Sequence, residues 1–256
     1  MTDLIRFLII FLMIFFKHKY VEAPEYVEIW VTWNVGQGQW VSHIQSDSCS
    51  HYDVGGEFGS FKKIKKALLT HCGRKLNRLS ISHWDYDHFS NLHFLARQLP
   101  RLCWLLYSNY GTQKASVQKL LQLSIPQCPQ IKNSLFIWVP TEIKNTNDSS
   151  VVIESQGVLL PGDSSIKQER QWVPHFQLQK TEVLILGHHG SRTSSGKILI
   201  EHLPSLAFAI SSARYARFRH PHPDVVQRLR RAQIPVIRTE DWGNIWFKTY
   251  PKRQKP

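Results

Sequence analysis

Short apolar runs separated by turn residues recur along the chain, and this pattern predicts a fold rich in β-strands. Residues 26–33 alternate between apolar and polar side chains, and residues 40–44 resume the pattern after Gly36 and Gly38. Such a pair of runs is typical of a β-hairpin. Further runs that predict strands lie at residues 51–54, 79–82, 103–107, 135–139, 151–154, 157–160, 182–186, 206–210, 236–237 and 243–250.

Helical spacing of apolar residues occurs in a few segments between these runs. In residues 61–71, Ile64, Leu68 and Leu69 fall on one side of a helix, and four lysines lie near the other side. The other segments predicted to be helical are residues 92–99, 115–123 and 223–232. Strands that end in polar residues, with helices between them, indicate two stacked sheets with helices outside. The chain shows no internal repeat and no long linker, so residues 25–256 are predicted to form one domain.

The first 24 residues have a different character from the rest of the chain. Residues 4–16 are apolar apart from Arg6, and the basic run Lys17-His18-Lys19 follows them. This stretch is short for a membrane span, and it resembles a signal peptide or a short membrane anchor. A buried first strand or helix is the alternative. The expected location is therefore membrane-associated or exported, on the periplasmic or extracellular side.

The charge of the chain favours a polyanionic partner. Thirty-two Lys and Arg residues against nineteen Asp and Glu residues give a net charge of +13. Nucleic acid is the first candidate partner and an acidic membrane the second, although a basic protein without either partner has the same composition. The four cysteines lack the close spacing of a zinc knuckle or a redox pair, so they are expected to be small buried side chains. Export would make disulfides available to them.

The segment from His83 to His88 concentrates groups that bind metals. It holds two imidazoles and two carboxylates within six residues, in the order His83, Asp85, Asp87, His88. Imidazole and carboxylate are ligands for borderline and hard divalent cations. A predicted buried strand ends just before this segment, where a loop on a rigid sheet can carry active-site residues. The sequence therefore predicts a metal site here.

Several motifs, taken together and in order, resemble the metallo-β-lactamase superfamily. Residues 82–88 resemble its HxHxDH motif, in the HxDxDH form of the hydrolase domain of ComEC-type DNA-uptake proteins. The other matching motifs are Val35-Gly36-Gln37-Gly38, Tyr52-Asp53-Val54-Gly55-Gly56, Pro161-Gly162-Asp163, Gly187-His188-His189-Gly190-Ser191 followed by Thr193-Ser194-Ser195, and Arg219-His220-Pro221. The resemblance covers about residues 30 to 247. It implies an α/β (α+β) protein with a four-layer αββα sandwich and a dinuclear site between the sheets.

The resemblance also implies roles for individual residues. Two divalent metal ions, zinc or manganese, are expected, and the ligands carried over are His83, Asp85, Asp87, His88, Asp163 and His188. Asp87 is also expected to orient or deprotonate the attacking water, and His220 to act as a substrate-side acid or as a further ligand. His189 is expected to point away or to orient a ligand, and Asp53 to orient a ligand histidine or cap a turn.

The function that these features favour is a metal-dependent nuclease or phosphodiesterase acting on DNA during DNA uptake. Arginines near the late motifs are expected to hold backbone phosphates, namely Arg192, Arg214, Arg217 and Arg219. Tyr215, Phe218 and Trp242 are candidates for stacking on unpaired bases. A membrane DNA-uptake channel is the other partner that the resemblance suggests.

Two alternatives stay open at this point. The first is another hydrolase on the same scaffold, such as a lactonase, thioesterase or β-lactamase, because a fold does not determine a substrate. The second is a DNA-binding module with weakened catalysis. It is motivated by departures from the family pattern: Asn34 and Gln39 replace acidic residues, and Ser90-Asn91 replace glycines.

Overall fold

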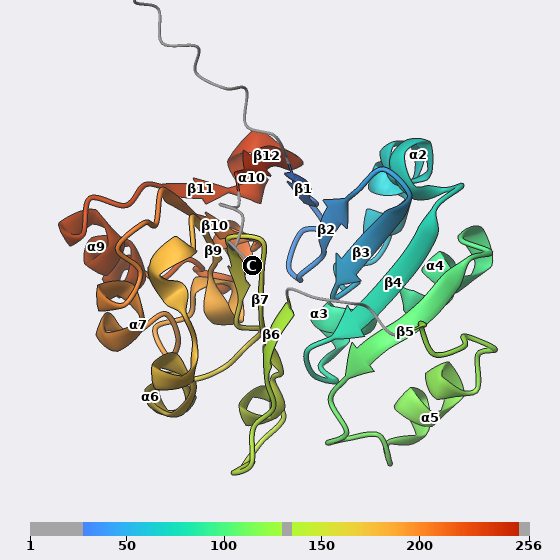
Figure 1. Ribbon diagram of the computed structural model, residues 1–256, viewed down its shortest axis with the longest axis horizontal. Coiled ribbons are helices and arrows are strands. Elements are labelled where there is room, and N and C mark those ends of the chain that lie inside the picture. The colour runs from blue at the N-terminus through green and yellow to red at the C-terminus, as the bar shows by residue number, and fades with distance from the viewer. Residues whose placement is uncertain (1–27, 130–134, 251–256) are drawn as a thin grey trace, which may run out of the picture.

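Two six-stranded β-sheets lie face to face in the computed structural model, which describes residues 28–129 and 135–250 (Figure 1). Side chains from both sheets, among them Trp30, Val41, Ile153 and Ile185, are buried together in one cluster. The stacked sheets predicted from the strand pattern are therefore confirmed. Residues 1–24, the expected signal peptide or anchor, lie outside the described residues.

The first sheet is half antiparallel and half parallel. Its strands are β1 (Glu28–Thr32), β2 (Val41–Ile44), β3 (Ser48–Tyr52), β4 (Leu76–Ile81), β5 (Leu102–Tyr107) and β12 (Ile245–Thr249). They lie in the order β12-β1-β2-β3-β4-β5. The pairs from β12 to β3 are antiparallel, and β3, β4 and β5 run parallel. The last strand of the chain thus pairs with the first described one.

The second sheet has the same number of strands and a parallel majority. Its strands are β6 (Leu135–Trp138), β7 (Val152–Ser155), β8 (Val158–Leu160), β9 (Val183–Ile185), β10 (Phe208–Ser211) and β11 (Val236–Arg238). They lie in the order β11-β10-β9-β8-β7-β6, with β8 to β11 parallel and β6, β7 and β8 antiparallel. Parallel strands place their carboxyl ends, and the loops that follow, at one edge of the sheet.

Helices cover the outer face of each sheet (Figure 1). Those on the first sheet are α2 (Ser60–Cys72), α4 (Leu92–Gln98) and α5 (Ala115–Leu121), and those on the second are α6 (Ile166–Trp172), α7 (Lys197–Glu201) and α9 (Pro223–Arg231). In α2, Ile64 and Leu68 are buried while the lysines are exposed, as the spacing predicted. Apolar clusters between each sheet and its helices complete a four-layer αββα sandwich, which confirms the predicted fold class.

Short helical turns lie in the connections between these elements. They are α3 (Tyr86–Phe89), α8 (Tyr215–Phe218), α10 (Thr239–Trp242), and the 3₁₀ turns η1 (Asn147–Ser149), η2 (Val173–His175), η3 (Leu178–Lys180) and η4 (Gly187–Gly190). Two of them, α3 and η4, carry expected metal ligands. No helix within residues 28–129 and 135–250 has the length and apolar character needed to cross a bilayer.

The four cysteines form two disulfides, the alternative that the sequence left open, and Cys49, Cys72 and Cys103 are also buried as expected. Cys49 on β3 pairs with Cys72 at the end of α2, and Cys103 on β5 pairs with Cys128. The partners are 23 and 25 residues apart, so their proximity depends on strand order and cannot be read from spacing. Both disulfides lie on the half of the sandwich built on the first sheet.

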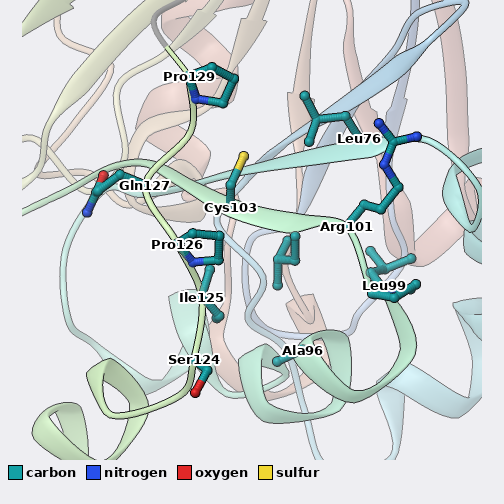
Figure 2. A pocket seen from close by; sticks show the side chains of 12 residues that line it. Leu76, Ala96, Leu99, Arg101, Cys103, Ser124, Ile125, Pro126, Gln127 and Pro129 are labelled. Atoms are coloured by element: carbon teal, nitrogen blue, oxygen red, sulfur yellow. The ribbon is translucent and has the colours of Figure 1, made fainter.

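A cavity of about 260 Å³ lies beside the second disulfide (Figure 2). Leu76, Leu99, Arg101 and Pro126 are among the residues that line it, together with Cys103. The residues that line the cavity are mostly apolar, and none of them is His, Asp or Glu. This cavity therefore lacks the groups that would bind a divalent cation, and the candidate site lies elsewhere.

Candidate metal centre

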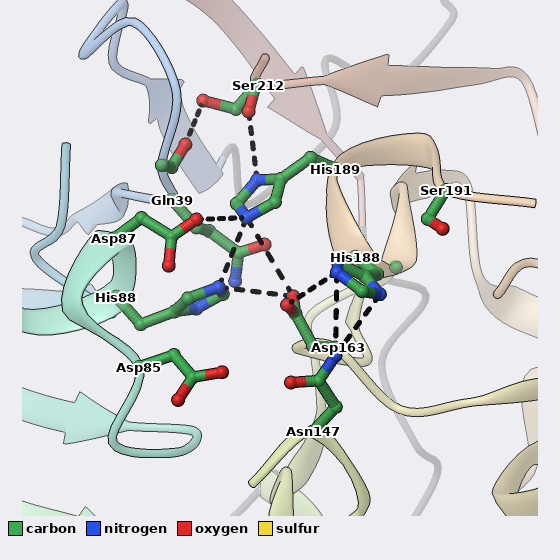
Figure 3. A network of polar contacts seen from close by, with 12 residues as sticks. Gln39, Asp85, Asp87, His88, Asn147, Asp163, His188, His189, Ser191 and Ser212 are labelled. Atoms are coloured by element: carbon green, nitrogen blue, oxygen red, sulfur yellow. Dashed lines mark hydrogen bonds and ion pairs between the residues drawn. The ribbon is translucent and has the colours of Figure 1, made fainter. Parts of the chain in front are cut away.

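Side chains that can bind metals meet where strands of both sheets end. His83 follows β4, and the turn α3 adds Asp87 and His88. From the second sheet, Asp163 follows β8 and His189 follows β9. Figure 3 shows the α3 side chains facing those of the second sheet. The sandwich thus brings together residues that lie a hundred positions apart in the sequence.

Two groups of three residues place their ligand atoms within 4.8 Å of one another. The first group is His83, His88 and Asp163, all buried, and the second is Asp87, His88 and His189. His88 belongs to both groups. We call these five residues the metal centre. Imidazoles and carboxylates in overlapping triads are a donor set that zinc and manganese accept.

The environment of His83 fits a bound cation. Its Nε2 atom is buried and has no hydrogen-bond partner among the described residues. The same atom lies 3.6 Å from Asp85 Oδ2 and 3.7 Å from Asp163 Oδ2, beyond hydrogen-bonding distance of either carboxylate. A buried nitrogen without a partner is costly in a folded protein. A cation between this imidazole and the carboxylates would satisfy it.

The imidazoles of the metal centre all direct Nε2 toward it and use Nδ1 for contacts with the protein. The Nδ1 partners are Ser150 Oγ for His83 at 3.2 Å, Asp53 Oδ2 for His88 at 2.8 Å, and the Ser212 carbonyl oxygen for His189 at 3.0 Å. A ligand histidine held through its second nitrogen has a fixed ring orientation and tautomer. The three rings are therefore oriented before any cation binds.

Charge in the metal centre keeps its carboxylates in the ligating form. Burial opposes ionisation of Asp163, but the His88, His189 and His83 imidazoles hold its pKa well below the usual range. Burial likewise opposes ionisation of Asp87, and the hydrogen bond from His189 with nearby imidazole charge lowers its pKa. Conversely, burial disfavours the charged form of His88, while Asp163 and Asp53 raise its pKa well above the ordinary value. A cation that binds here would compete with a proton at His88.

The Asp85 carboxylate lies at the opening of the metal centre. Its side chain is 37% exposed, and its pKa is lowered chiefly by the interaction with the nearby His83 imidazole. Asp85 belongs to neither group of three, although its Oδ2 approaches His83 Nε2. Its expected ligand role stays a prediction.

Close backbone approach fixes the loop that carries Asp87 and His88. The Gln39 amide donates to the Asp87 carbonyl at 3.0 Å, and the Val54 amide donates to the His88 carbonyl at 2.8 Å. At Gly55, an added Cβ would lie 1.7 Å from the Asp87 carbonyl oxygen. Only glycine allows this approach, so the Gly-Gly pair that follows Asp53 has a steric function at the metal centre.

Curated proteins similar to this chain are connected with competence and recombination. ComE operon protein 3 of Bacillus subtilis is 29% identical over 75% of this chain and 27% of its own length. Recombination protein 2 of Haemophilus influenzae is 26% identical over 87% of this chain and 29% of its own. Competence protein ComA of Neisseria gonorrhoeae is 26% identical over 91% of this chain and 34% of its own length. The chain thus spans about a quarter to a third of these relatives, and no family model matches it.

Solved structures with the same fold include proteins of the metallo-β-lactamase type. The metallo-β-lactamase fold protein YhfI from Bacillus subtilis superposes with a TM-score of 0.57 at 10% identity, covering 87% of this chain and 100% of YhfI. Igni18, a metallo hydrolase from Ignicoccus hospitalis, gives 0.54 at 11% identity, covering 87% and 99%. The chain has the metallo-β-lactamase fold. It is also a distant homologue of the competence proteins over most of its length.

Within this metallo-β-lactamase fold, the two adjacent histidines both face the carboxylates. His189 is 1% exposed, and its Nε2 lies 3.2 Å from Asp87 Oδ2. It therefore does not point away, and its contact with Asp87 agrees with the other expectation, that it orients a ligand. His188 is 29% exposed, and its Nε2 lies 3.6 Å from Asp163 Oδ2. Both residues have positive φ angles, 48° and 57°, and this unusual pair of left-handed residues turns both rings inward.

Asp53 orients the His88 ring, as expected, and it also holds the start of the loop that carries His83 and His88. Besides His88, its carboxylate accepts hydrogen bonds from the Ser82 amide at 2.7 Å and from Gln39 Nε2 at 2.9 Å. Gln39, noted only as a departure from the family pattern, is thus a donor to this carboxylate. An acidic side chain at position 39 could not donate this hydrogen bond without first binding a proton.

Three residues that the sequence did not single out for a role contact the metal centre. Ser150 Oγ accepts from the Asp163 amide at 3.0 Å in addition to its contact with His83. Asn147 Nδ2 lies 3.3 Å from His188 Nδ1, and Ser212 holds His189. Asn147 and Ser150 belong to a polar loop without periodicity. The fold brings this loop back to the metal centre.

His220 lies beside His188 rather than within the metal centre. The centroids of the two rings are 6.0 Å apart. Burial, reinforced by the neighbouring histidines, lowers the pKa of His220 to about 4, so the imidazole is neutral at pH 7. A neutral imidazole can bind a cation or accept a proton, whereas the expected acid role needs a protonated ring. Its role stays a prediction.

The four arginines expected to bind substrate make other contacts. Arg214 forms an ion pair with Glu57. Arg217 and Arg219 pack over aromatic rings, those of Phe218 at 5.0 Å and Tyr215 at 5.6 Å. Arg192 is exposed in the loop after η4. Arg219 directly precedes His220, and Arg214 and Arg217 lie within six residues of it in the sequence. The role of these arginines in binding phosphates stays a prediction.

Proposed function

We propose that this chain is a metal-dependent hydrolase that cleaves phosphodiester bonds in DNA. The observation that carries the proposal is the metal centre itself: two overlapping groups of metal-binding side chains, with a buried His83 nitrogen that has no hydrogen-bond partner in the described part of the chain. Relatives named for competence and recombination favour DNA as the substrate. The net charge of +13 favours a polyanion over neutral lactone, thioester or β-lactam substrates.

In this proposal, zinc or manganese ions, two per chain, are held by the metal centre with His188 and Asp85 at its edge. When bound, such ions polarise a phosphoryl oxygen and make a bound water nucleophilic at neutral pH. Asp87 is suited to orient that water, because its side chain is 33% exposed at the opening while His189 holds its Oδ2. Asp163 is buried and bridges His83 and His88, so it serves as a ligand and not as a proton carrier.

The exposed edge of the metal centre has groups suited to a phosphate backbone. The loop from Arg214 to His220 contains three arginines and lies next to His188. Guanidinium groups form bidentate contacts with phosphate oxygens. We infer that a DNA strand enters along this loop, with its reacting phosphate between His188 and Asp87.

We further propose that the protein works outside the reducing cytoplasm, membrane-associated or exported, and together with a membrane DNA-uptake channel. The two disulfides support the first part, because disulfides persist in oxidising compartments and are rare in the cytosol. The competence names of the relatives support the second part.

A cleavage assay with the full chain tests the proposed function. Single-stranded and double-stranded DNA, a lactone, a thioester and a β-lactam are each incubated with manganese or zinc. We expect cleavage of DNA, abolition by chelation, and a loss of about a hundredfold or more in Asp87→Ala. Asp47→Ala, which removes an exposed carboxylate near β3, is the matched control and should leave activity unchanged.

Other outcomes would redirect the proposal. Turnover of a lactone, thioester or β-lactam without DNA cleavage would replace the nuclease by another hydrolase. Salt-dependent DNA binding that persists after chelation, without turnover, would identify a binding module with weakened catalysis.

A further inference from the structure

The 193–196 segment connects the two loops of the second sheet that carry metal-binding residues. The Ser194 hydroxyl donates to the carbonyl oxygen of Ser164, the residue after Asp163, at 2.6 Å. The Ser195 hydroxyl accepts from the amide of Gly187, the residue before His188, at 3.1 Å. Both serines are 0% exposed. One short segment therefore holds both loops through two side-chain hydroxyls.

Both loops contain left-handed residues, and in the loop after β9 these residues are not glycine and are therefore strained. Gly162 has a φ of 56°, and the non-glycine residues His188 and His189 have φ angles of 48° and 57°. Left-handed conformations of non-glycine residues cost about 1 kcal/mol or more each, and they persist only where the surroundings determine them. β8 and β9 pair in parallel, and the His188 amide donates to the Gly162 carbonyl at 3.0 Å, so the two serine hydroxyls add to a backbone contact that already joins the two loops.

The far end of the 193–196 segment is anchored in the helical layer. The Glu169 carboxylate of α6 accepts from the Gly196 amide at 2.7 Å, and the Arg228 guanidinium of α9 donates to the Ser195 carbonyl. Glu169 is 0% exposed. A buried carboxylate is unfavourable unless it forms hydrogen bonds, and the bond from Gly196 to Oε2 offsets part of this cost. The segment is thus tied to two helices as well as to two loops.

Two further contacts, both made by Thr193, also tie the 193–196 segment to its surroundings. The Ile166 amide donates to the Thr193 carbonyl at 2.8 Å, which joins the start of α6 to the segment. The Thr193 hydroxyl lies 3.3 Å from His188 Nδ1. The segment therefore contacts the loop of Asp163 and the ring of His188 as well as the backbone before it.

We propose that Ser194 and Ser195 are positioning residues that set the separation between Asp163 and the adjacent histidines His188 and His189. This inference rests on the proposed metal centre. Cation binding tolerates only small deviations in ligand distance, of about 0.2 Å. Loss of either hydroxyl removes one of the contacts that hold these loops together, and this weakens cation binding without removing any ligand.

Manganese titration of the full chain by calorimetry tests this inference in Ser194→Ala and Ser195→Gly. Glycine suits the φ of 52° at position 195, so this variant removes the hydroxyl without adding strain. Ser205→Ala is the matched control, because the Ser205 hydroxyl also donates to a backbone carbonyl at 2.6 Å but lies at an exposed position away from the metal centre. We expect the manganese Kd to rise about tenfold or more in the first two variants and to stay unchanged in the control.

Two further readouts separate positioning from simple stabilisation. The KM for DNA should stay unchanged in both variants, because neither serine is accessible to substrate, while kcat falls. Variants that lower the Tm of the metal-free protein but keep the wild-type manganese Kd would show a merely structural role and overturn the inference. If the wild-type protein binds and cleaves normally and both variants match Ser205→Ala, the inference alone fails. If the wild-type protein binds no metal, the proposed function fails with it.

Discussion

The Asp53 carboxylate lies 2.8 Å from His88 Nδ1 and fixes the ring that both groups of the metal centre share. His88 Nε2 then faces Asp163 Oδ1 at 3.1 Å and His189 Nε2 at 3.2 Å. A carboxylate behind a ligand imidazole selects the tautomer that leaves Nε2 free for a cation. Asp53 should therefore affect cation binding through the His88 ring, although its own oxygens accept hydrogen bonds from protein groups and do not face the cation site.

Asp53→Asn should weaken cation binding strongly. The amide can present its NH₂ group to His88, which favours the wrong tautomer, so the Kd for manganese or zinc should rise about 10- to 100-fold. Calorimetric titration measures this change. Asp47→Asn at an exposed position is the control. A wild-type Kd in Asp53→Asn would show that the ring is oriented by other contacts.

Gly55→Ala should disrupt the loop that carries Asp87. An added Cβ would meet the Asp87 carbonyl oxygen at 1.7 Å, and a backbone atom cannot rotate away. We expect a loss of about 3 kcal/mol in the free energy of unfolding, together with weaker cation binding. Gly59→Ala is the control: it has a φ of 79° but open space around it, so it should cost only about 1 kcal/mol. Equal losses in both variants, measured by urea unfolding, would contradict the steric argument.

The sequence predicted most of the fold because apolar periodicity is local. The strands and the long helix α2 have runs long enough to reveal their period. The helix α6 was missed because its only apolar residues are the first and the last, Ile166 and Trp172, and α7 was missed because it has only five residues. Strand β3 starts at Ser48, three residues earlier than predicted, because its polar residues are buried on both faces and hide the alternation.

The candidate site was predictable to the extent that its residues lie in motifs. The HxDxDH segment identified His83 and His88, and the order of later motifs identified Asp163. Contacts made by Asn147 and Ser212 had no signal, because they depend on how loops fold back in space. The inward turn of His189 depends on two consecutive positive φ angles, which side-chain identity does not predict.

The two disulfides should contribute substantially to stability. Each closes a loop of about 25 residues between elements of the first half, and loops of this length are worth about 3 kcal/mol. The double variant Cys103→Ser/Cys128→Ser should therefore unfold at a lower urea concentration than the wild-type protein. Reducing agent should lower the wild-type midpoint further than it lowers the midpoint of the variant, which retains only Cys49–Cys72. No effect of reducing agent on either protein would show that the cysteines are not paired in solution.

Glu154 on β7 should make stability fall as pH rises. It is 7% exposed, and burial raises its pKa from 4.5 to about 7, against the hydrogen bond from the Gly157 amide. The native state therefore holds a proton between these two values that the unfolded state has released. Its contribution is fully present below pH 4.5 and is lost as pH rises through 7.

The variant Glu154→Gln isolates this contribution, because His51 and Glu169 also titrate in the wild-type protein. Burial lowers the pKa of His51 to about 4, which removes stability as pH falls and opposes the Glu154 trend. Burial raises the pKa of Glu169 to about 7, which adds to it. Glutamine keeps an acceptor for Gly157 and carries no charge, so the variant should match the wild-type protein at pH 5 and exceed it at pH 8 by on the order of 3 kcal/mol. Urea unfolding at both pH values, with the exposed Glu142→Gln as control, measures the difference. A constant difference between Glu154→Gln and wild type across this range would mean that Glu154 ionises equally in the folded and unfolded states.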